Sequence, residues 1–286
     1  MIAEQLTDPV AYHGEGAYWH PSWGGLKWVD MLRGDILSLD PATGAIRRMP
    51  TGSSIAAMIR PRQGGGFVAA TERSLTLWDA SETLEWSTPP LWDADERFNE
   101  GAVDPAGRVL CGTITASRAP GAASMWRMGP DREAAPILHD LTISNGLGFT
   151  LDGTRAYYVD SPTRRVDVFD VTPSGDLTGR RPFVTFGDDV AGDPDGLCVD
   201  AGGGVWVAFY DGSCVRHFDA DGRPQLVVET PGVTRVTSCT LGGPDLTTLY
   251  LTTSRENLPA DEQPAAGSLF AAEVGVRGFP GTPAAL

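Results

Sequence analysis

Three polar residues, each followed directly by glycine, stand far apart in the chain at Glu15, Asn145 and Asp195. Two carboxylates and one amide carbonyl are hard oxygen donors, which suit Ca²⁺, Mg²⁺ or Mn²⁺ and tolerate Zn²⁺ or Fe²⁺. If the fold brings the three side chains together, they would bind one divalent metal ion and leave positions open for water and a substrate oxygen. The donor set alone does not choose among these ions, because selectivity depends on the geometry of the cavity.

Hydrolysis is the chemistry that such a centre would support. A bound cation can polarise a carbonyl group as a Lewis acid, and the unshared oxygen of Asp195 could accept a proton from an attacking water. Asn-Gly and Asp-Gly are also common in tight hairpin turns, so each pair taken singly is more simply explained as a turn. The metal-site prediction therefore depends on whether the rest of the chain places the three residues at equivalent positions.

A repeated unit provides that equivalence. Each copy begins with a polar or small residue and continues with short apolar strands separated by turns, as in Arg155–Asp160 with Arg165–Asp170 and Val205–Tyr210 with Ser213–Asp219. The copies follow one another at intervals of 39 to 50 residues and begin at Glu15, Ser54, Glu100, Asn145, Asp195 and Ser238. Six units of this length with up to four strands each predict an all-β fold, a six-bladed β-propeller.

The propeller explains how the three polar residues could meet. We expect one domain spanning residues 1–286, with a strand before Asp8 completing the last blade beside residues near Ser268–Val274. No amphipathic helical stretch of convincing length interrupts the pattern. The innermost strand of each blade lines the central channel, so residues at the start of these strands converge, and the glycine after each lets the backbone approach the axis.

Composition and charge exclude several other classes of protein. The formal net charge of −15 and the lack of a basic stripe argue against nucleic-acid partners. No apolar run is long enough to span a bilayer, and Met1–Glu4 do not begin a signal peptide, so we expect no membrane partner and a cytoplasmic protein. The cysteines lack paired spacing and are expected to be buried free thiols: Cys111, Cys198, Cys214 and Cys239.

Several motifs follow one another in a characteristic order over nearly the whole chain. The first are Gly14-Glu15-Gly16-Ala17-Tyr18-Trp19, Arg97-Phe98-Asn99-Glu100-Gly101 with Asp104-Pro105-Ala106-Gly107-Arg108, Ile143-Ser144-Asn145-Gly146-Leu147 and Pro194-Asp195-Gly196-Leu197. Further motifs are Tyr157-Tyr158-Val159-Asp160-Ser161, Val205-Trp206-Val207-Ala208, and Thr237-Ser238-Cys239 followed by Gly242-Gly243. These motifs resemble those of the gluconolactonase/regucalcin (senescence marker protein) family, in family order. The set is specific because its members occur together.

The resemblance implies a divalent cation held by Glu15, Asn145 and Asp195, and hydrolysis of a small-molecule sugar lactone to the aldonic acid. It also implies that Arg97 and Asn99 face the substrate, which suits a fixed-charge donor and an amide that can donate and accept. A simpler role for Arg97 is a surface salt bridge with Glu96 or Asp95. Two alternatives stay open: a metal-dependent hydrolase of other esters or organophosphates, and a noncatalytic metal-binding or ligand-binding propeller.

Two departures from the family pattern bear on the substrate. Asn99-Glu100-Gly101 stands where the family commonly has Asn-Asp-Gly, and no carboxylate occurs in the stretch from Ile114 to Arg118, where family sugar lactonases often carry one. We therefore expect Ser117 or Arg118 to rim the pocket and to shift the preference toward a smaller or more acidic lactone. His13 and His139 are interpreted as structural or surface residues, and Glu256–Gln263 as a surface loop over one channel mouth.

Overall fold

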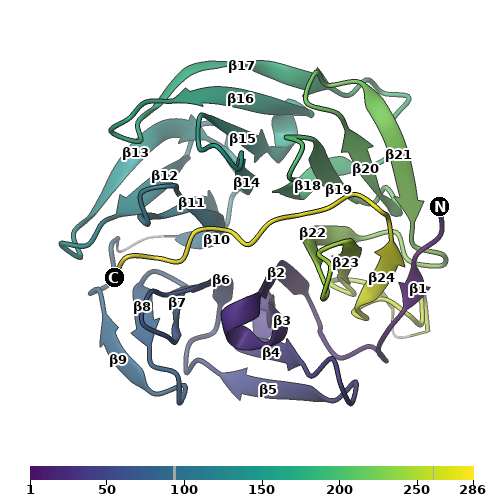
Figure 1. Cartoon of the computed structure of the whole chain (residues 1–286), viewed down its shortest axis with the longest axis horizontal. Coiled ribbons are helices and arrows are strands. Elements are labelled where there is room, and N and C mark those ends of the chain that lie inside the picture. Colours follow the sequence, from purple (N-terminus) through teal and green to yellow (C-terminus); the bar gives the residue numbers. More distant parts are fainter. Residues whose placement is uncertain (93–94, 260) are drawn as a thin grey trace.

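Six four-stranded antiparallel sheets surround a central axis in the computed structural model (Figure 1), which describes residues 1–92, 95–259 and 261–286. The predicted six-bladed β-propeller is therefore confirmed. Helical structure in the described residues is limited to three short 3-10 turns, η1 (Pro21–Trp23), η2 (Met31–Arg33) and η3 (Ser161–Thr163). None of these has the length or apolar character that crossing a membrane would need.

The six sheets are named blades 1 to 6, and in each the strands are given from the channel outward. Blade 1 contains β2 (Gly14–His20), β3 (Gly25–Asp30), β4 (Asp35–Leu39) and β5 (Ile46–Pro50). Blade 2 contains β6 (Ala56–Pro61), β7 (Phe67–Thr71), β8 (Leu75–Trp78) and β9 (Leu84–Ser87). Blade 3 contains β10 (Glu96–Val103), β11 (Val109–Thr115), β12 (Ala123–Met128) and β13 (Ala134–Leu141).

The second half of the chain repeats the arrangement and closes the ring. Blade 4 contains β14 (Ser144–Phe149), β15 (Arg155–Asp160), β16 (Arg165–Val171) and β17 (Leu177–Thr185). Blade 5 contains β18 (Asp193–Val199), β19 (Val205–Tyr210), β20 (Cys214–Phe218) and β21 (Pro224–Glu229). Blade 6 contains β22 (Val236–Gly242), β23 (Thr248–Thr253), β24 (Phe270–Glu273) and, as predicted, the early strand β1 (Glu4–Gln5).

Burial explains why the inner strands are almost continuously apolar. Neighbouring blades cover both faces of an inner strand, so every residue of β6 is buried, whereas most of the outer strand β17 is exposed. Large side chains fill the space between strands, as where the Phe67 and Trp78 rings stack with centroids 5.7 Å apart. Each fully buried side chain of this size contributes about 1.5–3 kcal/mol to stability.

All six inner strands share an irregularity close to their first residues. The pairing with the second strand of the blade shifts between Glu15 and Tyr18 in β2, between Ser144 and Leu147 in β14, and at corresponding points of the other four inner strands. Such β-bulges bend the strand and re-aim its side chains. The bulges therefore set which side chains reach the channel mouth.

The bulges correct three of the six predicted repeat positions. In blade 3 the irregularity begins after Phe98, so Asn99, and not Glu100, takes the position that corresponds to Asn145. In blade 2, Ser54 precedes β6, whose irregularity lies between Ala56 and Met58. In blade 6 it is Thr237, and not Ser238, that takes the position corresponding to Asp195. The sequence pattern matched Glu100-Gly101-Ala102 of blade 3 with Glu15-Gly16-Ala17 of blade 1. The position of the bulge, and not this match, determines which side chain faces the axis.

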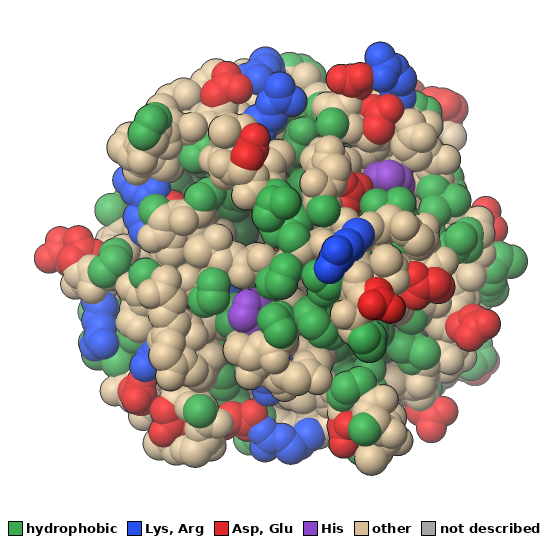
Figure 2. Space-filling view, viewed as in Figure 1, with side chains coloured by type: hydrophobic (Ala, Val, Ile, Leu, Met, Phe, Trp, Pro, Cys, Tyr) green, Lys and Arg blue, Asp and Glu red, His purple; other side chains and the backbone are tan. Residues whose placement is uncertain are grey.

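Residues 275–286 form a C-terminal strap that crosses one face of the ring (Figure 1). Backbone hydrogen bonds tie it to blades 6 and 5 through Leu246 and Ala201, and to blades 2 and 3 through Pro61 and Gly107. Figure 2 shows this face, with apolar side chains gathered toward its middle and most acidic side chains near its edge. The strap thus covers the channel at the end where the inner strands finish.

Candidate active site

A pocket of about 150 Å³ opens at the other end of the channel, where the inner strands begin. All five residues that the sequence predicts for the site line it: Glu15, Arg97, Asn99, Asn145 and Asp195. The remaining lining residues are His13, Ile114, Arg118, Ile143, Ser161, Asp193, Tyr210 and Glu256. The structure therefore brings the predicted residues together from blades 1, 3, 4 and 5.

Glycines beside the polar residues allow the inner strands to approach one another closely. A Cβ atom on Gly146 would lie 2.6 Å from the backbone nitrogen of Leu197 and 2.8 Å from the carbonyl oxygen of Asp195. A Cβ atom on Gly196 would lie 2.7 Å from Oγ of Ser238. Both distances are far below a normal contact, so only glycine lets blades 4, 5 and 6 converge beside Asn145 and Asp195.

A short hydrogen-bond chain fixes the side-chain amide of Asn145. Its Nδ2 donates to Oγ of Ser161 at 2.8 Å, and that hydroxyl donates to the carbonyl oxygen of Pro194 at 2.7 Å. Nδ2 of Asn99 donates to Oδ1 of Asn145 at 2.9 Å and to the carbonyl oxygen of Ser144 at 2.9 Å. One lone pair of Asn145 Oδ1 stays free for a cation, and the chain connects blades 3, 4 and 5.

Two aspartates hold the backbone that leads into the site. In blade 1, Oδ1 of Asp30 accepts hydrogen bonds from the backbone nitrogens of Tyr12 and His13, both at 3.0 Å. In blade 4, Oδ1 of Asp160 accepts one from Ile143 at 2.8 Å. Both aspartates are buried at the end of the second strand of their blade, just opposite the bulge. The recurrence of Asp at this place in two repeats was a signal that our sequence reasoning did not use.

The two carboxylates lie in a strongly desolvated setting. Glu15 and Asp195 are only 2% and 6% exposed, and neither forms an ion pair with any residue that the structure describes. Burial, and then the nearby charge of Glu100, raises the pKa of Glu15 well above its usual range. Burial, and then the charge of Glu15, does the same to the pKa of Asp195. A divalent cation between the two would offset both the desolvation and the repulsion.

The donor set fits a hard cation. Oε2 of Glu15 accepts a hydrogen bond from the Gly16 nitrogen at 2.6 Å, which leaves its other oxygen for a metal ion. Within the described ranges, no three His, Cys, Asp or Glu side chains gather as a metal-ligand group. The third donor here is the amide oxygen of Asn145, a ligand type that Ca²⁺ in particular accepts readily.

Arg97 turns toward the pocket instead of toward the neighbouring acids. Its Nη1 donates to Oδ1 of Asn99 at 3.0 Å and to the carbonyl oxygen of Phe98 at 2.9 Å, and lies 3.3 Å from Sδ of Met31. Among the described residues it makes no ion pair with Glu96 or Asp95. Its Nε and Nη2 atoms have no hydrogen-bond partner in the described part of the chain, so they are free to bind a ligand.

Sequence reasoning missed His13, Tyr210 and Glu256, which also line the pocket. Nδ1 of His13 lies 2.8 Å from Oγ of Ser254 and 3.5 Å from Oε2 of Glu256. Burial, and then the charges of Arg97, Arg235 and Arg118, lowers the pKa of His13 to about 3, so its ring is neutral at pH 7. Glu256 places the start of the predicted loop Glu256–Gln263 at this mouth, although residue 260 of that loop lies outside the described residues.

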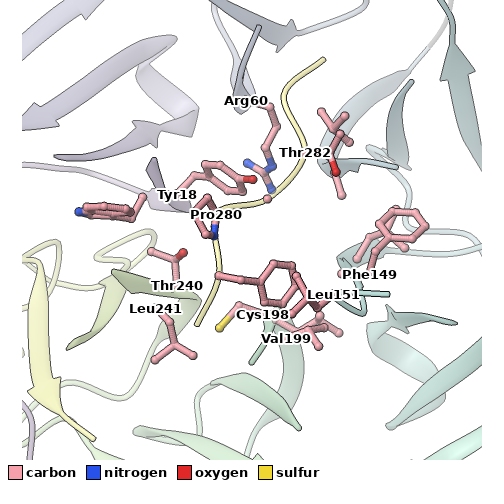
Figure 3. Close-up of a pocket in the computed structure, with 18 of the residues that line it drawn as sticks. Tyr18, Arg60, Phe149, Leu151, Cys198, Val199, Thr240, Leu241, Pro280 and Thr282 are labelled. Atoms are coloured by element: carbon pink, nitrogen blue, oxygen red, sulfur yellow. The ribbon is translucent and has the colours of Figure 1, made fainter. Parts of the chain in front are cut away.

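A second pocket, of about 160 Å³, lies under the C-terminal strap at the opposite mouth. Figure 3 shows Arg60 and Tyr18 on one side of it and apolar side chains such as Phe149 and Val199 on the other, with Pro280 and Thr282 of the strap across it. The Arg60 guanidinium lies 4.5 Å from the centre of the Tyr18 ring. Glu100 lines this pocket and not the first, as its place in the bulge requires.

Comparisons with known proteins agree with the fold and identify the family. Residues 13–255 match the family model described as "SMP-30/Gluconolactonase/LRE-like region". Pentonolactonase XacC of Haloferax volcanii is 33% identical over 292 residues, covering 98% of this chain and 97% of that protein. A 6-deoxy-6-sulfogluconolactonase of Pseudomonas putida is 32% identical over 271 residues, covering 93% and 92%.

The solved structures give the same result. A luciferin-regenerating enzyme has a TM-score of 0.89 at 26% identity, with 100% of this chain and 99% of that chain covered. The family model, the curated relatives and this structure all span most of the residues that build the pocket. The chain belongs to the SMP-30/gluconolactonase/LRE-like family.

Proposed function

We propose that this protein is a divalent-metal-dependent lactonase that hydrolyses a sugar lactone to the open-chain hydroxy acid. The observation that carries the proposal is the convergence of Glu15, Asn145 and Asp195 with Arg97 and Asn99 in one pocket. A site that only held a structural ion would not need a half-buried arginine whose free N–H groups face the same cavity. Family membership supports lactone hydrolysis as the reaction class, since its relatives include named lactonases.

Glu15, Asn145 and Asp195 would hold the cation, in keeping with their oxygen donors and with the lack of ion pairs to either carboxylate in the described residues. When bound, the cation would supply Lewis-acid polarisation of the lactone carbonyl and would lower the pKa of water. Ser161 keeps the amide of Asn145 from rotating, because its hydroxyl accepts from Nδ2. The amide oxygen therefore stays directed toward the pocket.

Lactone opening needs one water molecule and the movement of one of its protons to the ring oxygen, and the chain offers a group that can carry this proton. The water oxygen bonds to the carbonyl carbon, the ring C–O bond breaks, and the former ring oxygen leaves as a hydroxyl group. Asp195 accepts the proton from the water and returns it to the ring oxygen, so that the products are a carboxylic acid and an alcohol. Arg97 donates to oxygens of the lactone, and Oδ1 of Asn99 accepts from a hydroxyl group of the lactone, so that together they orient the ring.

Family membership does not identify the lactone. Two relatives of nearly equal identity, 33% and 32%, carry the names of different lactonases, one for a pentonolactone and one for a sulfonated gluconolactone. The choice of substrate must therefore come from residues of this pocket that differ among relatives.

The test is proton release at controlled pH from gluconolactone, xylonolactone, arabinonolactone and galactonolactone, corrected for spontaneous hydrolysis. Metal-stripped protein would be measured alone and with Ca²⁺, Mg²⁺, Mn²⁺ or Zn²⁺ restored singly, with Asp195→Ala as the inactive control. We expect turnover that needs a metal ion and falls at least 1,000-fold in the control, since Asp195 both binds the ion and moves the proton (roughly the loss seen when a residue acting in this way is removed).

Two results would contradict the proposal. Turnover of aryl esters or organophosphates without turnover of any lactone would favour a different hydrolase. Tight metal binding, measured by calorimetry, with no turnover of any of these compounds would favour a noncatalytic binding protein.

A further inference from the structure

Two arginines of blade 3 face the candidate active site without a carboxylate partner. Arg97 comes from β10, and Arg118 comes from the turn between β11 and β12. Neither forms an ion pair within the described part of the chain, where other arginines pair with aspartate, for example Arg164 with Asp193 at 2.7 Å. The guanidinium of Arg118 also makes no hydrogen bond to any described residue.

The backbone of the turn places Arg118 at the rim of the pocket. Arg118 has a φ of 51°, in the left-handed region that non-glycine residues seldom adopt, and its backbone nitrogen donates to the carbonyl oxygen of Thr115 at 3.0 Å. Ser117, the other residue considered from the sequence, does not line the pocket.

Charge in the pocket is divided between two walls. The arginines lie on the wall formed by blade 3, whereas Glu15, Asp195 and Glu256 come from blades 1, 5 and 6. A divalent cation held as proposed would neutralise Glu15 and Asp195, and Asp193 is already paired with Arg164. One carboxylate, Glu256, then faces two guanidinium groups, so the loaded pocket keeps a net positive charge.

We infer that the physiological substrate is a lactone bearing an acidic group, a carboxylate or a sulfonate, and that Arg118 binds this group together with Arg97. The inference rests on the proposed lactonase function and names the substrate class of the same site. Guanidinium groups suit this task because their planar set of N–H donors matches the oxygens of carboxylates and sulfonates. The stretch Ile114–Arg118 offers no carboxylate, which would repel such a substrate.

The experiment compares kcat/KM of the metal-loaded protein for three six-carbon lactones that share a ring and differ at carbon 6. One is gluconolactone, with a hydroxyl group there, and the others carry a carboxylate or a sulfonate. We expect the natural protein to prefer one or both acidic lactones, and we expect Arg118→Ala to reduce the ratio of acidic to neutral kcat/KM about 10- to 100-fold, the value of a charge-assisted hydrogen bond. Arg118→Lys should recover part of the ratio.

Arg132→Ala is the matched control. Arg132 is an exposed arginine with a φ of 62° in the next turn of the same blade, between β12 and β13, and does not line this pocket. Arg132→Ala should leave the ratio of acidic to neutral kcat/KM unchanged. An unchanged ratio would show that neither the loss of one positive charge nor the relief of a left-handed backbone explains the effect of Arg118→Ala. Raising the ionic strength should reduce the preference for acidic lactones, because the rim arginine is exposed.

The outcomes separate this inference from the proposed function. Metal-dependent hydrolysis of gluconolactone with no preference for either acidic lactone would overturn the inference and leave the lactonase intact. An equal loss for all three lactones in Arg118→Ala would also overturn it, since Arg118 would then serve the fold or the ring and not the acidic group. No turnover of any lactone would overturn both.

Discussion

At the scale of single residues, the orientation of Asn145 depends on one hydroxyl group. Ser161 accepts from Nδ2 of Asn145 and donates to the carbonyl oxygen of Pro194, so it connects a proposed metal ligand of blade 4 with the segment that carries Asp195. Groups that orient a metal ligand in this way are often worth a factor of 10 to 100 in metal affinity. Ser161 is therefore a positioning residue with a measurable role.

We expect Ser161→Ala to raise the dissociation constant for the activating metal ion about 10-fold or more, because the amide of Asn145 could then rotate. The measurement is calorimetric metal titration, with thermal unfolding of the metal-free protein recorded beside it. Ser161→Thr keeps the hydroxyl group and should recover most of the affinity. A metal affinity unchanged in Ser161→Ala would show that the amide is held by other contacts.

A second residue-scale prediction concerns Asp200, in the turn after β18. Its Oδ1 accepts from the backbone nitrogens of Gly202 and Gly204, both at 2.9 Å, and its Oδ2 accepts from Nε2 of His217 at 2.9 Å and Nε1 of Trp206 at 3.2 Å. Burial opposes ionisation, but the hydrogen bonds from His217 and Gly204 outweigh it and lower the pKa of Asp200. The ionised form is thus favoured in the folded state.

A lowered carboxyl pKa gives stability that is present above the unfolded value, near 4, and is lost as the pH falls below it. We expect Asp200→Asn to reduce the free energy of unfolding at pH 7 by about 1–3 kcal/mol and to flatten its decrease below pH 4. Urea unfolding between pH 3 and pH 7 measures both quantities. The exposed Asp188→Asn is the control, and an equal acid dependence in Asp200→Asn and the natural protein would contradict the assignment.

At the scale of strands, the bulges of the inner strands position the site. In β14 and β18 the bulge turns Asn145 and Asp195 toward the channel mouth, and the glycine that follows each of them lets the neighbouring blade approach. A larger residue at such a glycine cannot be absorbed by a side-chain rotation, because a Cβ on Gly146 would meet backbone atoms of β18.

Gly146→Ala should therefore separate β14 from β18, lower the melting temperature by several degrees and weaken metal binding at the same time. Gly129→Ala is a suitable control, since its Cβ would come no closer than 3.3 Å to a flexible side-chain oxygen of Asp131. Differential scanning calorimetry with and without metal checks both effects. A Gly146→Ala protein with normal stability and affinity would mean that the two strands can move apart freely.

The strands also show which features of the fold and the site could be predicted from the sequence. The repeat predicted the number of blades, the closure of blade 6 by β1, and the meeting of Glu15, Asn145 and Asp195, because equivalent positions in a ring must converge. It aligned Glu100 wrongly, since hydrophobic patterns do not reveal which of two bulge residues faces the axis. His13 and Glu256 belong to connecting segments, whose position depends on contacts between blades 1 and 6 that no local pattern contains.

At the scale of the whole molecule, the C-terminal strap ties together blades that are distant around the ring. It exchanges backbone hydrogen bonds with blades 2, 3, 5 and 6, and its Ala284 is fully buried against the core. Because the strap lies at the mouth opposite the candidate active site, its loss should lower the stability of the protein without changing the active site.

Removal of residues 275–286 should lower the melting temperature by about 5–10 °C, since several backbone hydrogen bonds and buried contacts are lost together. Metal affinity, measured by calorimetry at a temperature where the shortened protein is folded, should change less than threefold. A large loss of metal affinity in the folded, shortened protein would contradict the independence of the two mouths.

The pairing of β1 with β24 has a consequence for synthesis. Glu4 and Gln5 are translated before the inner strands of all six blades, yet their partners Ala271 and Phe270 lie in β24, which is translated after those strands. Blades 1 to 5 can form one after another as they appear, but the circle stays open, with β1 unpaired, until β24 has been translated. Contacts this distant in sequence form slowly, so the open ring is the stage at which the newborn chain most needs protection from aggregation.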